Sequence, residues 1–368
     1  MPIGILYRDE LKEYDFGEGH PFSGSRYELF YQFLQQHLPE DDNYRMIEAE
    51  QASDADLLLI CHKNYIEFTR GYYEAAYYGL SYPGKFTDFH SMDNMPTGKS
   101  GKLEEAARLV VGQAKLACQM VQEGQFKKMV SVGGGLHHAR FDYGEGFCLY
   151  NDVAFCGKYL LQEYKLDRIL ILDIDAHTGN GTYHYFQEEP RVLFIDVHQD
   201  PRGIFPYTGF SDEIGTGNGK GFTINVPMPL YAGDDCYRMV FESIIEPITH
   251  EFQPQIIICN GGADPHYLDN LTSLGLDLVG FRMLGEKVSA MAEICDGKVI
   301  DLIASGYTRA VLPYCWMSTI AGLAGFNLHI DKPVLIPAEL KREQPMDGTR
   351  QVIDEVKSHL KDYWNCLK

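Results

Sequence analysis

The sequence lacks closely spaced cysteines. Its nine cysteines are scattered along 368 residues, and none belongs to a CxxC pair. An odd number of scattered cysteines does not indicate a disulfide framework. Several lie in apolar runs, as Cys259 does at the end of IIIC. We interpret them as buried thiols of a protein from a reducing compartment.

The sequence also lacks long apolar runs and is poor in basic residues. No uninterrupted apolar run approaches the roughly 20 residues of a membrane span. The N-terminal stretch MPIGILYRDELKEYD has neither the basic region nor the apolar core of a signal peptide. Lys and Arg number 32 against 52 Asp and Glu, for a net charge of −20. Such a charge repels phosphate backbones and attracts cationic ligands. We therefore expect a soluble, cytoplasmic protein without nucleic-acid or membrane partners.

Short apolar runs alternate with longer amphipathic segments such as residues 102–124. Runs that are apolar throughout are typical of strands buried on both faces of a parallel sheet. The alternation indicates an open α/β fold. We predict one domain over residues 1–368, with a central, mostly parallel, multi-stranded sheet, helices on both faces, and a last helix at about 351–364. The runs expected as strands are 55–62, 128–134, 168–176, 191–198, 255–264 and 298–307.

Polar residues follow several of these runs. Ligands of open α/β sheets sit at the carboxyl ends of the strands, so the segments that follow the strands are expected at one edge. Residues two apart in a strand face the same way, so Asp175 and His177 can converge, with Asp173 one step deeper. Asp264 ends another run and is a candidate third ligand. Carboxylate and imidazole groups suit Zn²⁺, Fe²⁺ or Co²⁺. For any one of these acids alone, a helix N-cap is the plainer interpretation.

Two adjacent histidines and a tyrosine follow other runs. His137 and His138 come after a triple glycine, and imidazole titrates in the range of a general base beside an activated water. Tyr307 follows Ser305-Gly306 and has a hydroxyl that can stabilise an oxyanion. Taken singly, the histidines also fit ordinary loop positions. Tyr307 likewise fits plain packing, because the chain has 24 tyrosines.

Five motifs of this sequence resemble a known family. GGGLHHARFDYGEGFCLYND, DIDAHTGNGT, GIFPYTG, GGAD and GYTRAVLPYCW stand in the order and spacing of the histone deacetylase superfamily. That group includes the acetoin-utilisation-type and acetylpolyamine deacetylases, and it has the arginase/deacetylase fold. The resemblance covers about residues 15–325.

The resemblance implies a zinc-dependent amidohydrolase that acts on linear amide bonds. It would remove acetyl or related acyl groups from lysine side chains or other primary amines, by means of metal-activated water. Its substrate would be an acyl-lysine peptide or protein, or an acetylated small amine. The implied metal ligands are Asp175, His177 and Asp264, with Zn²⁺ the usual ion. The family also often binds a structural potassium ion, K⁺, through backbone oxygens near Asp173, Asp175 and His177.

The resemblance further implies roles for individual residues. His138 would be the general base and acid, His137 would act chiefly through its charge, and Tyr307 would stabilise the oxyanion. Asp173 would orient His137, and Asn180 would partner His138. The implied substrate-binding residues are Gly146, Phe147, Phe205, Leu271 and the rim acid Asp93.

The sequence departs from the family pattern at several positions. Asn180 stands where many members have Asp, and Thr178 replaces the histidine common in DxHHG. Asp196 occupies a position often held by serine beside the K⁺ site, and the family's glycine-rich run before the tyrosine reads IASGY here.

Other functions stay open beside this one. An acetylpolyamine or other small-molecule N-acetyl deacetylase has the same motifs. A ureohydrolase of the same fold would need an acid after His177, in a DxHxD pattern that is not found here. A non-catalytic acyl-lysine or metal-binding protein fits less well, because Tyr307 and both histidines are intact.

Overall fold

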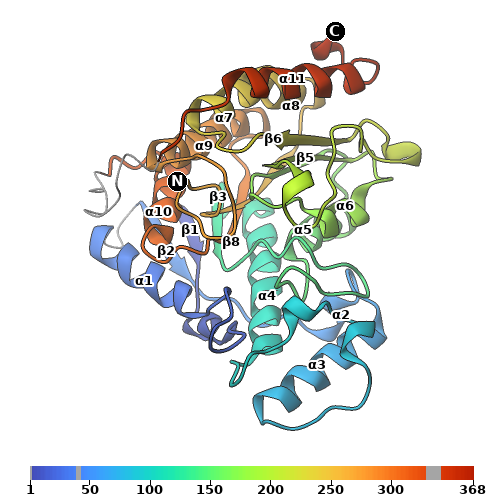
Figure 1. Cartoon of the computed structure of the whole chain (residues 1–368), viewed down its shortest axis with the longest axis vertical. Helices are drawn as coiled ribbons and strands as arrows, with labels where there is room; N and C mark the ends of the chain where they lie inside the picture. Colours follow the sequence, from blue (N-terminus) through green and yellow to red (C-terminus); the bar gives the residue numbers. More distant parts are fainter. Residues whose placement is uncertain (1, 39–42, 329–340) are drawn as a thin grey trace. The chain divides into compact units, whose positions relative to one another are not determined.

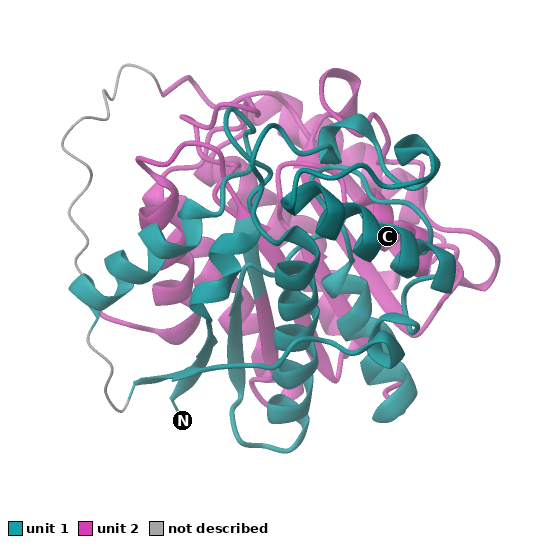
Figure 2. Cartoon of the chain, turned by 90° about the horizontal axis from the view of Figure 1, so that it is seen from below, with its two compact units in different colours: residues 1–165, 302–304 teal, residues 166–301, 305–368 magenta. Residues whose placement is uncertain are grey.

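The computed structural model describes residues 2–38, 43–328 and 341–368 (Figure 1). The chain divides into two compact units: unit 1 comprises residues 1–165 and 302–304, and unit 2 comprises residues 166–301 and 305–368 (Figure 2). Our interpretation of residues 1–368 as one catalytic domain stays a prediction, and it includes residues outside the described part.

In the described part of the chain, eight strands form one parallel sheet with helices around it. The strand order is β2-β1-β3-β8-β7-β4-β5-β6. This arrangement confirms the α/β fold predicted from the alternation of apolar runs and amphipathic segments. Strand β8 (Val299–Ser305) contributes residues 302–304 to unit 1 and its other residues to unit 2.

Unit 1 contains short parallel strands and the helices that pack beside them. Ile3 pairs with Tyr44 and Gly4 with Met129, and the amide of Gly133 donates to Ile303 O at 2.8 Å. The described helices and strands of unit 1 are β1 (Ile3–Leu6), α1 (Ser25–His37), β2 (Tyr44–Ile47), α2 (Asp54–Leu57), α3 (Lys63–Tyr77), α4 (Leu103–Gln122), β3 (Lys128–Val132) and α5 (Asp152–Glu163), with short 3₁₀ helices at Asp9–Glu13, Phe86–Asp88 and Met92–Asn94.

The prediction of a strand at residues 55–62 was wrong. The segment begins with the helical turn α2, and its other residues form no strand. Ser53 and Asp56 form a reciprocal capping box, in which each side chain accepts a hydrogen bond from the other residue's backbone. Such a box stabilises a helix start, and here it outweighs the apolar run that suggested a strand.

Unit 2 contains the strands that carry most of the candidate site. Strands β4 (Ile169–Asp173), β5 (Val192–Gln199) and β7 (Ile256–Gly262) are buried at every residue. In their register Asp173 lies between Asp196 of β5 and Asn260 of β7. Polar side chains therefore meet at the carboxyl ends of three neighbouring strands.

The other described helices and strands of unit 2 follow the same alternation. They are α6 (Asn180–Phe186), β6 (Thr223–Met228), α7 (Asp234–Val240), α8 (Glu246–Phe252), α9 (Leu278–Met291), α10 (Leu312–Ala324) and α11 (Met346–Leu360), with a π-helical turn at Phe241–Ile245 and 3₁₀ helices at Pro201–Gly203, Gly217–Gly219, Ala292–Cys295 and Asn365–Leu367.

The last helix is shifted from its predicted position. Helix α11 spans Met346–Leu360 rather than about 351–364. It starts directly after Pro345, which lies at the N-cap position. Among the described residues, none of the helices has both the length and the apolar character needed to span a membrane.

Candidate active site

Two carboxylates and one imidazole converge in unit 2. Candidate ligand atoms of Asp175, His177 and Asp264 all lie within 4.8 Å of one another. His177 Nδ1 is 3.3 Å from Asp175 Oδ1 and 3.1 Å from Asp264 Oδ2. All three residues are buried, and Asp264 is 0% exposed. The structure thus brings together the three residues that we predicted as metal ligands.

The chain after β4 is folded by hydrogen bonds to its own carboxylates. Asp173 Oδ1 accepts from the amide of Asp175 at 3.1 Å, and Asp175 Oδ1 accepts from the amide of His177 at 2.8 Å. Ser305 Oγ donates to Asp264 Oδ1 at 2.7 Å. These bonds leave Asp264 Oδ2 facing the imidazole. The cluster is therefore held in place by backbone and hydroxyl donors.

The electrostatics of the cluster favour a bound cation. Burial alone would lower the pKa of His177, but its hydrogen bonds to Asp175 and Asp264 outweigh burial and raise that pKa to about 10. Burial, and then the charge of Asp175, raise the pKa of the Asp264 carboxyl. A proton on the cluster occupies the place that a metal would take. Two carboxylate oxygens and one imidazole nitrogen form a donor set that fits a zinc-type ion.

Asp173 is fixed from the neighbouring strand. Asn260 Nδ2 lies 2.9 Å from each Asp173 carboxylate oxygen. Both residues are fully buried. The Asn260 amide donates to this carboxylate and so fixes its position.

A buried contact between Asp196 and His198 anchors the loop that carries Phe205. Asp196 Oδ1 lies 2.6 Å from His198 Nδ1, and Asp196 Oδ2 accepts from the amide of Gly179 at 2.8 Å. Burial lowers the pKa of His198, but Asp196 outweighs it and the net shift is upward. The other ring nitrogen, Nε2, lies 2.8 Å from Gly209 O, which can only accept, so Nε2 is the donor of this bond. Asp196 thus acts through His198 on the loop after Phe205.

Thr178 anchors the same loop at a second point. Its hydroxyl donates to Thr208 O at 2.7 Å. A threonine in the place of the family's histidine therefore has a defined contact, next to the candidate ligand His177. The half-buried Phe205 and the exposed Tyr207 lie just before this anchor.

Tyr307 lies beside the cluster, and its backbone is held by Asp269, a residue that was not among the predicted site residues. The ring centroids of Tyr307 and His177 are 6.4 Å apart, and the rings are nearly perpendicular. Asp269 Oδ2 accepts from the amide of Tyr307 at 2.7 Å, and its Oδ1 accepts from the amide of Leu271 at 2.9 Å. Burial, and then the charge of Asp264, raise the pKa of Asp269 to about 7. Asp269 thereby fixes the tyrosine and the partly exposed Leu271 together.

The two adjacent histidines lie in unit 1. His137 Nε2 and His138 Nε2 are 3.1 Å apart, and both residues are buried. At this distance one nitrogen donates and the other accepts, so the pair can share a proton. Asn151 Nδ2 donates to His137 O at 3.0 Å and to Ala139 O at 3.1 Å. The pair is therefore held through its backbone.

Asp152 shapes the glycine loop before the histidines. Its carboxylate accepts from the amides of Gly135 and Leu136 at 2.7–3.0 Å. Burial raises the pKa of Asp152 to about 6, although these amide bonds oppose the shift. Asp152 was not among the predicted site residues. The signal available was an acid in LYND, at the end of the first motif.

The predicted substrate-binding residues of unit 1 lie together. Asp93 Oδ2 accepts from the amide of Gly146 at 2.8 Å, and burial raises the pKa of Asp93. Phe147 has a φ of 65°, and its carbonyl accepts from Tyr14 OH at 2.7 Å. Its ring packs edge-on against His20, with centroids 4.8 Å apart. Asp93 thus supports the turn that presents Phe147.

Some predicted partnerships join residues of different units. They are Asp173 with His137, Asn180 with His138, and Phe147 with Phe205, which would together bind the substrate. These partnerships stay predictions. Asn180 itself is buried at the start of α6, where its backbone N–H donates to Thr178 O at 2.8 Å.

Comparisons with known proteins agree on one family. The model of the histone deacetylase domain matches residues 20–323. A probable deacetylase of Archaeoglobus fulgidus is 35% identical, with 100% of both chains covered. The acetoin utilization protein AcuC of Staphylococcus xylosus is 34% identical over 88% of this chain and 82% of its own. AcuC of Bacillus subtilis is 31% identical over 85% and 79%, respectively.

A solved structure agrees with this fold. The crystal structure of the HDA15 HD domain has a TM-score of 0.81 and 22% identity, and the match covers 100% of this chain and 97% of that one. At this identity the likeness supports the fold alone. The family model and the relatives confirm the resemblance drawn from the motifs: the chain belongs to the histone deacetylase family and is a hydrolase of the deacetylase type.

Proposed function

We propose that this protein hydrolyses the amide bond between an acyl group, above all acetyl, and a primary-amine nitrogen, with an acyl-lysine side chain as its first substrate class. One observation carries the proposal: the buried Asp175–His177–Asp264 cluster, beside Tyr307, in a chain of the deacetylase family. Acetylated small amines, including acetylpolyamines, form the second substrate class, because their reacting amide is the same.

Asp175, His177 and Asp264 would hold the metal ion. Zn²⁺ suits their oxygen and nitrogen donors, and Fe²⁺ or Co²⁺ suits them as well. When bound, such an ion polarises the amide carbonyl and lowers the pKa of water. Purified protein should contain about one ion per chain, and Asp264→Ala should lose most of it. Asp212→Ala, at an exposed acid of the same unit, is the control. An Asp264→Ala protein with full metal content would overturn the assignment.

The protein's own residues move the protons. His138 takes a proton from the attacking water and returns one to the leaving amine. His137 supports it, because the 3.1 Å contact between their Nε2 atoms allows a shared proton. Asp173 and Asn180 are proposed to orient His137 and His138. Tyr307 donates a hydrogen bond to the developing oxyanion. The family also supports a structural K⁺ near Asp173, Asp175 and His177.

The substrate's stem would be gripped by apolar contact. Phe147 and Phe205 are proposed as walls, Gly146 and Leu271 as neighbours of the stem, and Asp93 as the rim acid. The reacting amide is neutral, so charge selectivity must come from the rest of the ligand. The chain carries a net charge of −20, which favours basic ligands and disfavours nucleic acid. The free thiols of all nine cysteines support a reducing location such as the cytoplasm.

A substrate panel tests the proposal. Acetyl-lysine peptides, longer acyl-lysine peptides, acetylpolyamines and small N-acetyl compounds are compared by kcat/KM with metal-loaded protein. Matched peptides with basic, neutral and acidic flanks are then compared at several salt concentrations. The basic flank should have the advantage at low salt. That advantage should shrink as the Debye length falls from about 10 Å at 0.1 M to about 3 Å at 1 M. Preference for acidic flanks, or a flat salt response, would contradict the charge argument.

A further inference from the structure

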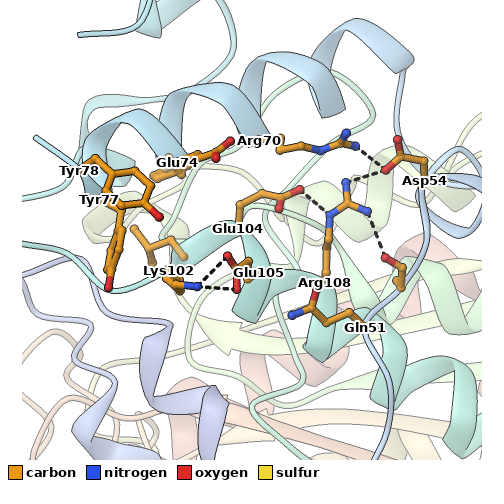
Figure 3. A pocket seen from close by; sticks show the side chains of 13 residues that line it. Gln51, Asp54, Arg70, Glu74, Tyr77, Tyr78, Lys102, Glu104, Glu105 and Arg108 are labelled. Carbon is orange, nitrogen blue, oxygen red and sulfur yellow. Dashed lines mark hydrogen bonds and ion pairs between the residues drawn. The ribbon is translucent and has the colours of Figure 1, made fainter. Parts of the chain in front are cut away.

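A cavity of about 570 Å³ lies within unit 1 (Figure 3). Helix α3, the start of α4 and the segment before α2 line it. Its volume falls in the range of pockets that hold small molecules. All of its lining residues belong to unit 1, and none is among the residues proposed above for catalysis or substrate binding.

Helical spacing explains which side chains line the cavity. Arg70, Glu74 and Tyr77 follow one another at i, i+4 and i+7 along α3. Glu104 and Arg108 stand at i and i+4 on α4. Residues at such spacing share one face of a helix. In Figure 3 the arginine–carboxylate pairs lie at one end of the cavity, and Tyr77, Tyr78 and Lys102 lie at the other.

The cations of the cavity are already neutralised. Arg108 donates from Nε to Glu104 Oε1 at 2.6 Å, and its Nη2 lies 2.8 Å from Asp54 Oδ1. Arg70 also pairs with Asp54, and Lys102 Nζ lies 3.1 Å from Glu105 Oε1. An anionic ligand would have to displace one of these carboxylates. The cavity is therefore poorly suited to a phosphate or carboxylate ligand.

Two carboxylates have unused acceptor capacity. Within residues 2–38, 43–328 and 341–368, the Glu74 side chain makes no ion pair and no hydrogen bond. Glu104 is 6% exposed, and its Oε1 accepts from both Arg108 and Tyr150. Its Oε2 accepts no hydrogen bond from the described residues. A carboxylate oxygen that accepts no hydrogen bond, in the wall of a cavity, favours a ligand that brings N–H groups.

The tyrosines supply a surface that accepts ammonium groups. Lys102 Nζ lies 5.8 Å from the centroid of the Tyr77 ring, which is within the range of cation–π attraction. Tyr78 packs nearly perpendicular to Tyr77, with centroids 5.1 Å apart, and is 65% exposed. The cavity thus already contains one ammonium group against an aromatic ring, and it presents a second ring to solvent.

We infer that this cavity is a binding site for an organic cation of the alkyl-diamine type. One ammonium group would take the free acceptors of Glu74 and Glu104, and the chain and second ammonium group would lie against Tyr77 and Tyr78. Four acids and three basic residues line the cavity, so one negative charge is left uncompensated. This site goes beyond the proposed deacylation and does not depend on it.

Direct binding tests the inference. 1,4-Diaminobutane is titrated into the metal-loaded protein by calorimetry. The probe 1,4-butanediol has the same chain without charge and should show no binding. Glu74→Gln should weaken diamine binding about three- to fivefold, as expected for loss of one partly exposed ion pair. Tyr78→Ala should weaken it as well. Both positions are exposed, so both variants should fold.

A matched control and two outcomes complete the test. Glu67→Gln changes an exposed acid two turns earlier on α3, outside the cavity, and should leave the affinity unchanged. Equal diamine affinity in wild type, Glu74→Gln and Tyr78→Ala would overturn the inference, because the diamine would then bind elsewhere. Tighter binding of inorganic phosphate than of the diamine would also overturn it. Since the readout is binding and not turnover, a failure of the proposed deacylation would leave this result intact.

Discussion

Loading a metal ion onto the Asp175–His177–Asp264 cluster should release about one proton per chain at pH 7.5. The perturbation is removal of bound metal by a chelator, followed by titration with Zn²⁺. Metal ligands must be deprotonated, so any proton that the cluster holds must leave when the ion enters. The metal-free cluster holds such a proton because two buried carboxylates surround one imidazole.

The structure sets the size of the effect. Hydrogen bonds to Asp175 and Asp264 overcome the burial penalty and raise the pKa of His177 to about 10. At pH 7.5 an imidazole with this pKa is protonated in about 99% of molecules, and below pH 10 the apparent metal affinity should fall about tenfold per pH unit. The pKa of Asp264 is raised as well, so the proton belongs to the cluster as a whole.

Calorimetry in two buffers of different ionisation enthalpy measures the released protons directly. We expect about one proton at pH 7.5, and an apparent affinity for Zn²⁺ that rises steadily from pH 7 to pH 9. His250→Gln, at an exposed histidine of unit 2, should behave as wild type. Release near zero at pH 7.5, together with an affinity that does not change between pH 7 and pH 9, would refute the electrostatic description of the cluster.

Three further predictions concern single side chains. His138→Ala should lower kcat more than His137→Ala at equal metal content, and equal, mild losses in steady-state assays would contradict a base role for His138. Asp269→Ala frees the amides of Tyr307 and Leu271 and should lower kcat on the order of tenfold without loss of metal, whereas unchanged kcat would show that Asp269 does not position the tyrosine. Burial raises the pKa of Asp301 to about 7, so the folded protein keeps this proton up to a higher pH than the unfolded chain does. The free energy of unfolding should therefore fall as pH rises from about 4 to 7, by up to about 4 kcal/mol. Asp301→Asn should therefore raise Tm more at pH 8 than at pH 5, and equal shifts in a thermal melt would refute this.

The sheet was predictable where strands are buried on both faces. The runs at 168–176, 191–198 and 255–264 became β4, β5 and β7, because such strands are apolar throughout. Strands β1, β2 and β6 were missed. Strands β1 and β2 have four residues each, too few for a clear pattern, and β6 contains Asn225 and Pro227.

Some residues of the candidate site were predictable from the sequence, and others were not. Asp175, His177 and Asp264 stand out because they are charged residues directly after apolar runs. Asp152, Asp269 and Ser305 do not, since their partners are backbone amides or a carboxylate elsewhere in the chain. The Ser305 and Asp264 pair is separated by 41 residues, and no spacing rule predicts such a bond. Long-range contacts of this kind become visible only in the folded chain.

The most direct test of the proposed function is the rate of acetate release from an acetyl-lysine peptide, measured for wild type and Tyr307→Phe at equal metal content. The wild-type protein should turn the peptide over. The variant removes one oxyanion donor without changing the ring, so its kcat should fall on the order of 10²–10³-fold. A variant that keeps near wild-type turnover, or a metal-loaded wild type that releases no acetate from the peptide, would contradict the account.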